Sequence, residues 1–307
     1  MRIIFLGTSV FAIPPLRALT GSKHEIPCVI TRPPRLAGRG RKLRQPPLYE
    51  YAKSRQLVIH QPEKLKTDFI EILKSLRPDI MVSAAYGAWL PESLLKLSPL
   101  GVVNIHPSLL PKYRGAAPIA RAILDGMNET GVSFMLTDSG WDTGPVIAAY
   151  TEKILSDDTA GSLEERLSLK AAGELISVIE EYADGKLTTR EQLGETIYAE
   201  KITTDETWLD WNRPAVYLDR MIRAFQPYPG ARTEYQGKTI KIAAARVASI
   251  SIEPGEIFIE DNSLYAGCGG EKSLEILMLQ PSSKRVLNTD EYLRGSEIKT
   301  GDRFGKA

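Results

Sequence analysis

The sequence contains few of the residues on which several protein classes depend. Cys28 and Cys268 are the only cysteines in 307 residues, which predicts no disulfide framework and excludes a zinc site made of cysteines alone. Histidine is nearly as scarce, with His24, His60 and His106 only. We therefore expect a protein that holds no metal and suits the reducing conditions of the cytoplasm.

Long apolar runs and an excess of one charge are also missing. The opening run "IIFL" meets Gly7 almost at once, too soon for a signal-peptide core, and nowhere do about 18 apolar residues follow one another. We therefore expect no membrane segment. The formal net charge is only +1, so any binding of nucleic acid would depend on a local basic patch.

The sequence does contain the composition of an ordinary globular protein, with 43% hydrophobic and 25% charged residues. Its length predicts about two domains. In the first part, helix patterns that start at Ile13 and Thr67 alternate with strand patterns, which read "RIIFLGT", "HEIPCVIT", "LVIHQ", "DIMVSAAY" and "GVVNIH". This order predicts a Rossmann-like, doubly wound, mostly parallel α/β sheet. A strand pair and an amphipathic helix over 163–179 follow.

The last hundred residues have a different pattern. The helical segment "AVYLDRMIRAF" precedes segments of period two, "KTIKIAA", "GEIFIE" and "KSLEILML", with glycine-rich turns such as "YAGCGGE". Strands at such short spacing predict a small, OB-like β-barrel. We therefore expect a first domain over 1–185, a linker over 186–205 and a C-terminal β-barrel domain over 206–307.

Two short segments suggest functions that the sequence does not support. The first strand leads into "FLGTSVFA", which has one glycine instead of the G-x-G-x-x-G fingerprint, so we expect no nicotinamide cofactor. The triplet Asp142-Thr143-Gly144 suggests an aspartic protease, but that chemistry needs two carboxylates that share a proton, and the triplet occurs once. By its local pattern, the triplet fits a turn better than a catalytic site.

A basic segment, "RPPRLAGRGRKLR", contains no acid. Its prolines and glycines exclude a regular helix, so we expect a long loop between the second strand and the next helix. Such loops are functional or disordered. An arm that contacts phosphates and a solvated loop are equally compatible with the pattern. The basic residues are Arg32, Arg35, Arg39, Arg41, Lys42 and Arg44.

The segment "LGVVNIHP" places an amide and an imidazole together. Side chains alternate faces along a strand, so Asn104 and His106 point one way and Val103 and Ile105 the other. The carboxyl end of a strand in an open parallel sheet is where ligand sites form. An amide donor beside a group that shuttles protons near neutral pH suits the attack of a substrate amine on a carbonyl carbon.

The segments "NIHPSLLPKYRGAAP" and "DSGWDTGPV" together resemble the folate-dependent formyltransferase family. Its core motif is Asn-x-His followed by Ser-Leu-Leu-Pro, with a later aspartate in an Asp-Thr-Gly loop. "FLGTSVFA", "AGRGRKL", "VSAAYGAWLP", "YAEKITTDETWLDW" and "IRAFQPYPGA" resemble the members that act on initiator tRNA. The resemblance implies transfer of the formyl group of 10-formyltetrahydrofolate to the α-amino group of methionine esterified to initiator tRNA.

The resemblance also implies roles for individual residues. The side-chain N–H of Asn104 would donate a hydrogen bond to the formyl oxygen, on which negative charge develops during the reaction. His106 would stabilise the tetrahedral species or move a proton. Asp142 would orient His106 or take part in proton transfer. The region over 1–185 would then be the catalytic domain.

Further residues match the family's binding segments. Those that match the folate-contacting stretches are Ser108, Leu109, Leu110, Pro111, Tyr86 and Gly87. Those that match the stretches that reach tRNA are Arg39, Arg41, Lys42 and Lys201. The family suggests a monomer. Enzymes that formylate a sugar amine or glycinamide ribonucleotide, enzymes that hydrolyse formylfolate, and an inactive RNA-binding scaffold remain as alternatives, and the basic segment and the additional β-domain favour the tRNA enzyme.

Overall fold

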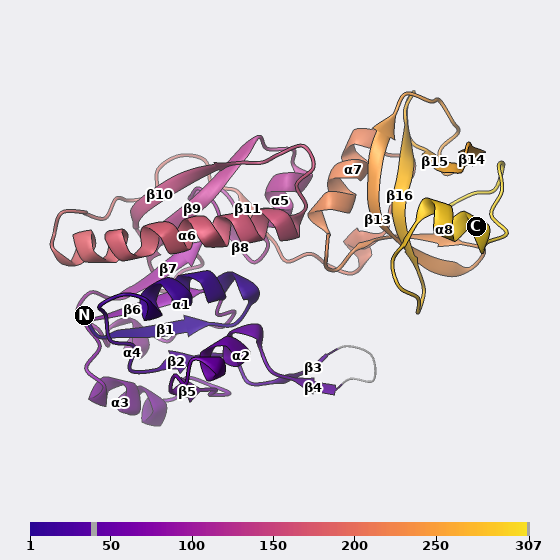
Figure 1. Ribbon diagram of the computed structural model, residues 1–307. Helices are drawn as coiled ribbons and strands as arrows, with labels where there is room; N and C mark the ends of the chain where they lie inside the picture. Colours follow the sequence, from indigo (N-terminus) through magenta and orange to yellow (C-terminus); the bar gives the residue numbers. More distant parts are fainter. Residues whose placement is uncertain (38–41, 306–307) are drawn as a thin grey trace. The chain divides into compact units, whose positions relative to one another are not determined.

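A computed structural model describes residues 1–37 and 42–305 of the chain (Figure 1). They form two compact units, each assembled from segments that are separate in the sequence. The first comprises Met1–Pro118, Glu129–Lys153 and Glu164–Ala199, and the second Ile119–Asn128, Ile154–Leu163 and Glu200–Ala307. The domain limits expected from the sequence stay a prediction, and two short segments of the expected first domain, Ile119–Asn128 and Ile154–Leu163, lie in the second unit.

The first unit is built on a seven-stranded sheet in the order β10-β9-β7-β6-β1-β2-β5. Its strands are β1 Ile3–Gly7, β2 Val29–Ile30, β5 Ile59–His60, β6 Ile80–Ala84, β7 Val102–His106, β9 Glu129–Leu136 and β10 Val146–Lys153. The first five are parallel to one another, and β9 and β10 are antiparallel. The chain runs outward from β1 through β2 to β5, returns to β6 on the other side of β1, and continues to β7. The predicted mostly parallel, doubly wound sheet is confirmed.

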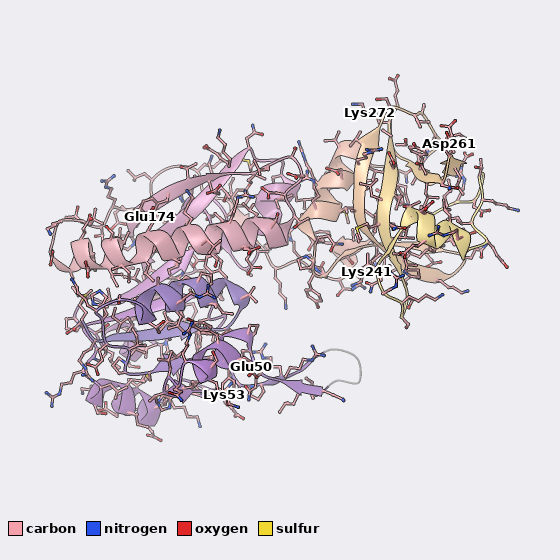
Figure 2. All side chains as sticks on the ribbon, in the orientation of Figure 1. Glu50, Lys53, Glu174, Lys241, Asp261 and Lys272 are labelled. Atoms are coloured by element: carbon pink, nitrogen blue, oxygen red, sulfur yellow. The ribbon has the colours of Figure 1, made fainter. Side chains whose placement is uncertain are left out.

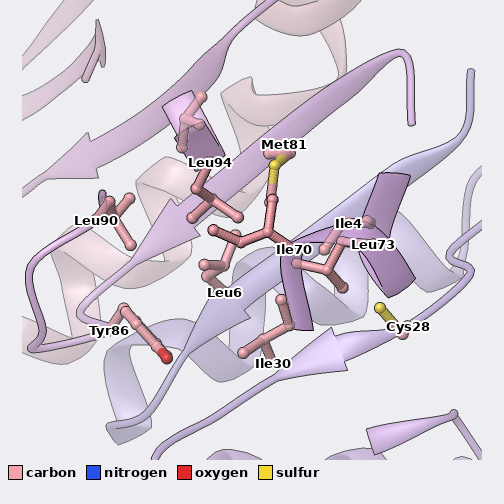
Figure 3. Close-up of a cluster of buried hydrophobic side chains, with 11 residues drawn as sticks. Ile4, Leu6, Cys28, Ile30, Ile70, Leu73, Met81, Tyr86, Leu90 and Leu94 are labelled. Atoms are coloured by element: carbon pink, nitrogen blue, oxygen red, sulfur yellow. The ribbon is translucent and has the colours of Figure 1, made fainter. Parts of the chain in front are cut away.

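The central strands are apolar because both faces of the sheet are covered. All five residues of β1 and all five of β6 are buried. Ile4 and Leu6 of β1 face the same cluster as Met81 of β6, and this cluster also includes Ile70 and Leu73 of α3 Thr67–Ser75 (Figure 3). The helical spacing of Phe69, Ile72, Leu73 and Leu76 predicts the buried side of α3. Leu73 is buried and Phe69 and Leu76 pack against the cluster, whereas Ile72 is 50% exposed.

The other helices of this unit also follow their sequence patterns. α1 Ile13–Thr20 has proline in its first turn. The N–H groups of the first turn have no carbonyl partner within the helix, so the N–H that proline lacks costs no hydrogen bond. α2 Pro47–Ser54 buries Leu48 and Ala52, four residues apart, and exposes Glu50 and Lys53 (Figure 2). α4 Glu92–Leu95 lies between β6 and β7, and α6 Ala160–Ala183 is the long amphipathic helix. Among residues 1–37 and 42–305, no helix combines the length and apolar character that crossing a membrane requires.

The prediction of a loop without regular structure over the basic segment is wrong in part. Two short strands, β3 Arg35–Ala37 and β4 Lys42–Arg44, pair antiparallel, with Leu36 opposite Leu43. Both leucines are exposed, at 62% and 66%. Because neither side of the hairpin packs on a core, the segment lacks the alternation of apolar and polar residues that would have predicted strands.

The second unit contains a six-stranded antiparallel sheet in the order β12-β13-β16-β15-β14, with β17 paired to β16. Its strands are β12 Ala231–Tyr235, β13 Lys238–Ala248, β14 Ile257–Glu260, β15 Ser263–Gly267, β16 Ser273–Pro281 and β17 Leu287–Asn288. α5 Pro118–Leu124, η2 Asp205–Thr207, α7 Ala215–Ala224 and α8 Thr289–Arg294 accompany them. The predicted β-rich C-terminal part is confirmed, whereas α5 and α8 were not predicted.

Candidate active site

The candidate site lies at the carboxyl ends of β6 and β7, beside the point where the strand order reverses between β1 and β6. Ligands bind at such a reversal in open α/β sheets. In β7, Val103 and Ile105 are buried, Asn104 is half-buried and His106 is 4% exposed. Within the part of the chain that the structure describes, the side-chain amide of Asn104 makes no hydrogen bond. Its N–H groups are therefore free to donate to a substrate oxygen.

The orientation of His106 follows from its two ring nitrogens. Nε2 lies 2.9 Å from the backbone oxygen of Tyr113. A carbonyl only accepts, so Nε2 carries a proton and donates it. In the neutral ring, Nδ1 is then unprotonated, and it lies 3.6 Å from Oδ2 of Asp142. The aspartate that was predicted to accompany His106 from 36 positions away therefore lies beside it.

The Asp-Thr-Gly loop between β9 and β10 has a structural reason for each of its three residues. Asp142 has φ of +51°, and its Oδ2 accepts the N–H of Gly115 at 2.9 Å. The Thr143 hydroxyl lies 2.8 Å from each carboxylate oxygen of Asp138. Gly144 passes so close to Leu136 that a Cβ would lie 1.8 Å from its carbonyl oxygen. The triplet forms a turn, as its local pattern predicts, and the turn directs Asp142 toward His106.

The Ser-Leu-Leu-Pro stretch is a loop held by hydroxyl groups. Ser108 is fully buried, and its hydroxyl donates to the carbonyl of Lys112 at 2.6 Å. Ser133 of β9 donates to the carbonyl of Ser108 at 2.7 Å and accepts the N–H of Leu110 at 3.1 Å. The Leu110–Pro111 peptide bond is cis. The Ser108 hydroxyl thus shapes the loop, and the half-buried side chains of Leu109 and Leu110 are the ones available to a ligand. Ser133 was missed, although a serine inside the apolar strand "GVSFML" was a visible signal.

Tyr86 and Gly87 lie in the loop that follows β6, but the Tyr86 side chain faces the core. It is 3% exposed and belongs to the cluster around Ile4 (Figure 3). Burial raises the pKa of its hydroxyl, although the nearby guanidinium of Arg32 opposes this shift. The Tyr86 carbonyl accepts from the Thr8 hydroxyl at 2.7 Å. The Tyr86 side chain is therefore part of the core beneath the site. Gly87 has φ of +71° and allows the chain to turn after β6.

Two exposed tryptophans near Asp142 were also missed. Trp89, on the loop after β6, is 52% exposed, and Trp141, which precedes Asp142, is 66% exposed. Their rings meet edge to face with centroids 5.7 Å apart. Two exposed aromatic rings in contact form an apolar surface, and such surfaces are candidates for ligand binding. The signal in the sequence was a tryptophan inside each of two motif segments, "AYGAWLP" and "SGWDTGP".

The basic residues singled out from the sequence are divided between the two units. Lys42 is exposed on β4 of the first unit, and Lys201 is exposed in the second unit. Arg39 and Arg41 lie outside the described residues. On the hairpin, Arg35 stands directly opposite Arg44. Among residues 1–37 and 42–305, no group of three or more His, Cys, Asp or Glu side chains could hold a metal ion.

Comparison with known proteins covers both units. Residues 1–179 match the family described as formyl transferase, and residues 201–297 match the family described as formyl transferase, C-terminal domain. The chain is 40% identical over 304 residues to the methionyl-tRNA formyltransferase of Halorhodospira halophila, which covers 98% of each chain. It is 40% identical over 309 residues to that of Neisseria meningitidis, which covers 99% of this chain and 100% of the relative.

Solved structures show the same fold. The methionyl-tRNA formyltransferase of Clostridium thermocellum has a TM-score of 0.60 at 18% identity, over 80% of this chain and 93% of its own. HypX from Aquifex aeolicus, in complex with tetrahydrofolic acid, has a TM-score of 0.66 at 18% identity over 100% of this chain. The chain spans about half of HypX, since it covers 51% of that protein. At these identities the likeness concerns the fold.

Proposed function

The chain belongs to the formyl transferase family, and we propose that it transfers the formyl group of 10-formyltetrahydrofolate to the α-amino group of methionyl initiator tRNA. One observation carries the choice of site: His106 lies between the Tyr113 carbonyl and the Asp142 carboxylate, on the same strand as the amide of Asn104. The identity of 40% over both units supports the choice of substrate.

The reaction requires a base, an oxyanion donor and a defined orientation. The amine of methionine has a pKa of about 8 when free and attacks the formyl carbon as the neutral form. A new C–N bond forms, and negative charge develops on the formyl oxygen, to which the Asn104 amide donates. The attacking nitrogen gives up a proton. The Asp142 carboxylate and the unprotonated Nδ1 of His106 face one another across 3.6 Å and can hold it.

Breakdown of the tetrahedral species completes the transfer. The bond from carbon to N10 of the folate breaks, the carbonyl re-forms, and the proton held by the Asp142–His106 pair passes to N10. Atoms and charge balance without a metal or a redox partner. In this scheme the Tyr113 carbonyl keeps the His106 ring in one orientation through the cycle.

The folate and the tRNA meet different parts of the chain. For the folate we propose the loop Ser108–Pro111, the turn at Tyr86 and Gly87, and the faces of Trp89 and Trp141, which suit planar rings. For the tRNA we propose the basic segment over 32–44, with Arg39, Arg41 and Lys42, together with Lys201. We further propose that the protein acts as a monomer in the cytoplasm.

The test is transfer of labelled formyl from 10-formyltetrahydrofolate to methionyl initiator tRNA, with methionyl elongator tRNA and free methionine run in parallel. Formylation of the initiator alone is the expected result. Transfer to a sugar amine or a nucleotide amine, with no product on any tRNA, would contradict the proposed acceptor and retain the proposed chemistry.

A further inference from the structure

One side chain that neither the motifs nor the mechanism uses lies against the Asp142 loop. Gln192 belongs to the segment that follows α6. Its Nε2 donates to the carbonyl of Asp142 at 2.8 Å and to that of Gly144 at 2.7 Å. Its Oε1 accepts from Nε of Arg114 at 2.9 Å and from Nη2 at 2.7 Å. Both N–H groups and both lone pairs of this amide are therefore in use.

The backbone around Gln192 joins the same two parts of the site. Arg190 and Val146 exchange two backbone hydrogen bonds, each 2.8 Å long. On the other side, β11 Tyr198–Ala199 pairs in parallel with β8 Arg114–Gly115. The segment over 190–199 thus lies between the loop that carries Asp142 and the strand that carries Gly115. Asp142 and Gly115 are themselves joined, because the Gly115 N–H donates to Oδ2 of Asp142 at 2.9 Å.

Asp142 depends on this support because its own conformation is unfavourable. A residue other than glycine in the left-handed region, here at φ of +51°, persists only when its surroundings hold it there. Asp138 and Thr143 hold the loop from within, and Gln192 holds two of its carbonyls from outside. Displacement of the loop would move the carboxylate away from Nδ1 of His106.

We propose that Gln192 is a positioning residue for the reaction, which keeps the Asp142 carboxylate facing His106 by joining the Asp142 loop to Arg114. The inference rests on the proposed function in that it assigns the proton transfer to Asp142 and His106. Only a primary amide can donate to two carbonyls and accept from a guanidinium at once. Glutamate keeps the acceptor and lacks the donors, and methionine lacks both.

Gln192→Glu separates this role from a general structural one. The variant still accepts from Arg114, with an added charge, but it presents carboxylate oxygens to the carbonyls of Asp142 and Gly144. We expect kcat to fall about 100-fold, as for a reacting group displaced by about 1 Å, with the KM for each substrate changed less than about twofold. Gln192→Met, which removes polar atoms without repulsion, should show a smaller loss of kcat. Gln280→Glu is the control, since Gln280 also donates to a carbonyl, that of Lys284 at 2.9 Å, in the second unit.

Imidazole nitrogen NMR supplies a readout that does not depend on turnover. The chain has three histidines, so each ring can be assigned by substitution. In Gln192→Glu the His106 resonances should shift while those of His24 and His60 stay in place. Unchanged kcat and His106 resonances in a folded variant would overturn the proposal, as would equal shifts at all three rings. Failure of the proposed function would appear instead as absent transfer by the unsubstituted protein, with the NMR comparison still informative.

Discussion

Asp142 shows how much of the site depends on single residues. Its carboxylate faces Nδ1 of His106 and accepts the N–H of Gly115, and its backbone carbonyl accepts from Gln192. Thr143 and Gly144 complete the turn through Asp138 and through close approach to the Leu136 carbonyl. A motif of three residues therefore serves geometry at two positions and the proposed chemistry at one.

Asp142→Asn tests this division. The asparagine oxygen can still accept the N–H of Gly115, so the loop should persist, but the negative charge that faces His106 is lost. We expect kcat to fall by about 10²- to 10⁴-fold, the usual contribution of a proton-transfer group, with the KM for the folate unchanged and a melting temperature near that of the unsubstituted protein. A loss of activity that follows a loss of folded protein would argue for a purely structural aspartate.

Trp141 provides a second test at the residue scale. If its ring covers the folate, Trp141→Ala should raise the KM for 10-formyltetrahydrofolate about 2- to 10-fold, which corresponds to about 0.5–1.5 kcal/mol of aromatic packing. The KM for tRNA should stay constant, because the ring is proposed to touch the folate only. Tyr228→Ala is the matched control, since that ring is 83% exposed in the second unit. Steady-state kinetics with each substrate varied in turn measure the KM for the folate and the KM for tRNA in both variants.

At the scale of elements, the β3–β4 hairpin has features that oppose its own stability. Arg35 and Arg44 face each other across the strands, and like charges in such pairs repel. Leu36 and Leu43, which pair across the strands, are exposed to solvent and contribute little apolar burial. A hairpin with this pattern gains from an anionic surface that neutralises its charges, which is what the phosphates of an RNA provide.

Replacing Arg35 and Arg44 by glutamine should therefore weaken tRNA binding and reduce its dependence on salt. For each phosphate that the variant no longer neutralises, we expect the slope of log K against log salt concentration to fall by about 0.7–0.9. The KM for the folate should not change. Lys53 and Lys74, which are exposed on α2 and α3, form the control pair. An equal loss of affinity for folate and tRNA in the arginine variant would contradict the assignment.

At the scale of the whole molecule, contacts between distant segments decide which parts belong together. The segment over 119–128 comes from the first half of the chain and lies in the second unit. There Arg121 on α5 forms an ion pair of 2.6 Å with Glu206 of η2. The hydrogen bond from Arg121, with others from Thr203, holds the pKa of Glu206 at about 2, below its ordinary 4.5.

Glu206→Gln tests the weight of this ion pair. Because the pKa of Glu206 is lower in the folded state, its stabilising effect is present above pH 4.5 and is lost as the pH falls toward 2. We expect the variant to lose about 1 kcal/mol of unfolding free energy at pH 7, a modest value because the side chain is 35% exposed and screened by water. Urea unfolding at pH 7 and pH 3 should show the difference narrowing at the lower pH. A difference independent of pH would exclude the charge as its cause.

The elements that depend on local pattern could be predicted from the order of the residues. The continuous apolar runs of β1 and β6 indicate strands covered on both faces, and the spacing in α3 indicates its buried side. Alternation along β7 places Asn104 beside His106, because neighbouring side chains in a strand point to opposite faces. The resemblance to a family then identified Asp142.

Which distant groups meet depends on how the folded chain packs, and no pattern in the sequence shows it. Three hydrogen bonds of the site correspond to no periodic pattern in the sequence. They join the Tyr113 carbonyl to His106, the Ser133 hydroxyl to the loop at Ser108, and the Gln192 amide to the Asp142 loop. Burial produces a pattern because it repeats with every turn or every second residue, whereas a hydrogen bond between two segments depends on one atom's position. That position is set when the sheet, its loops and the segment over 190–199 pack together.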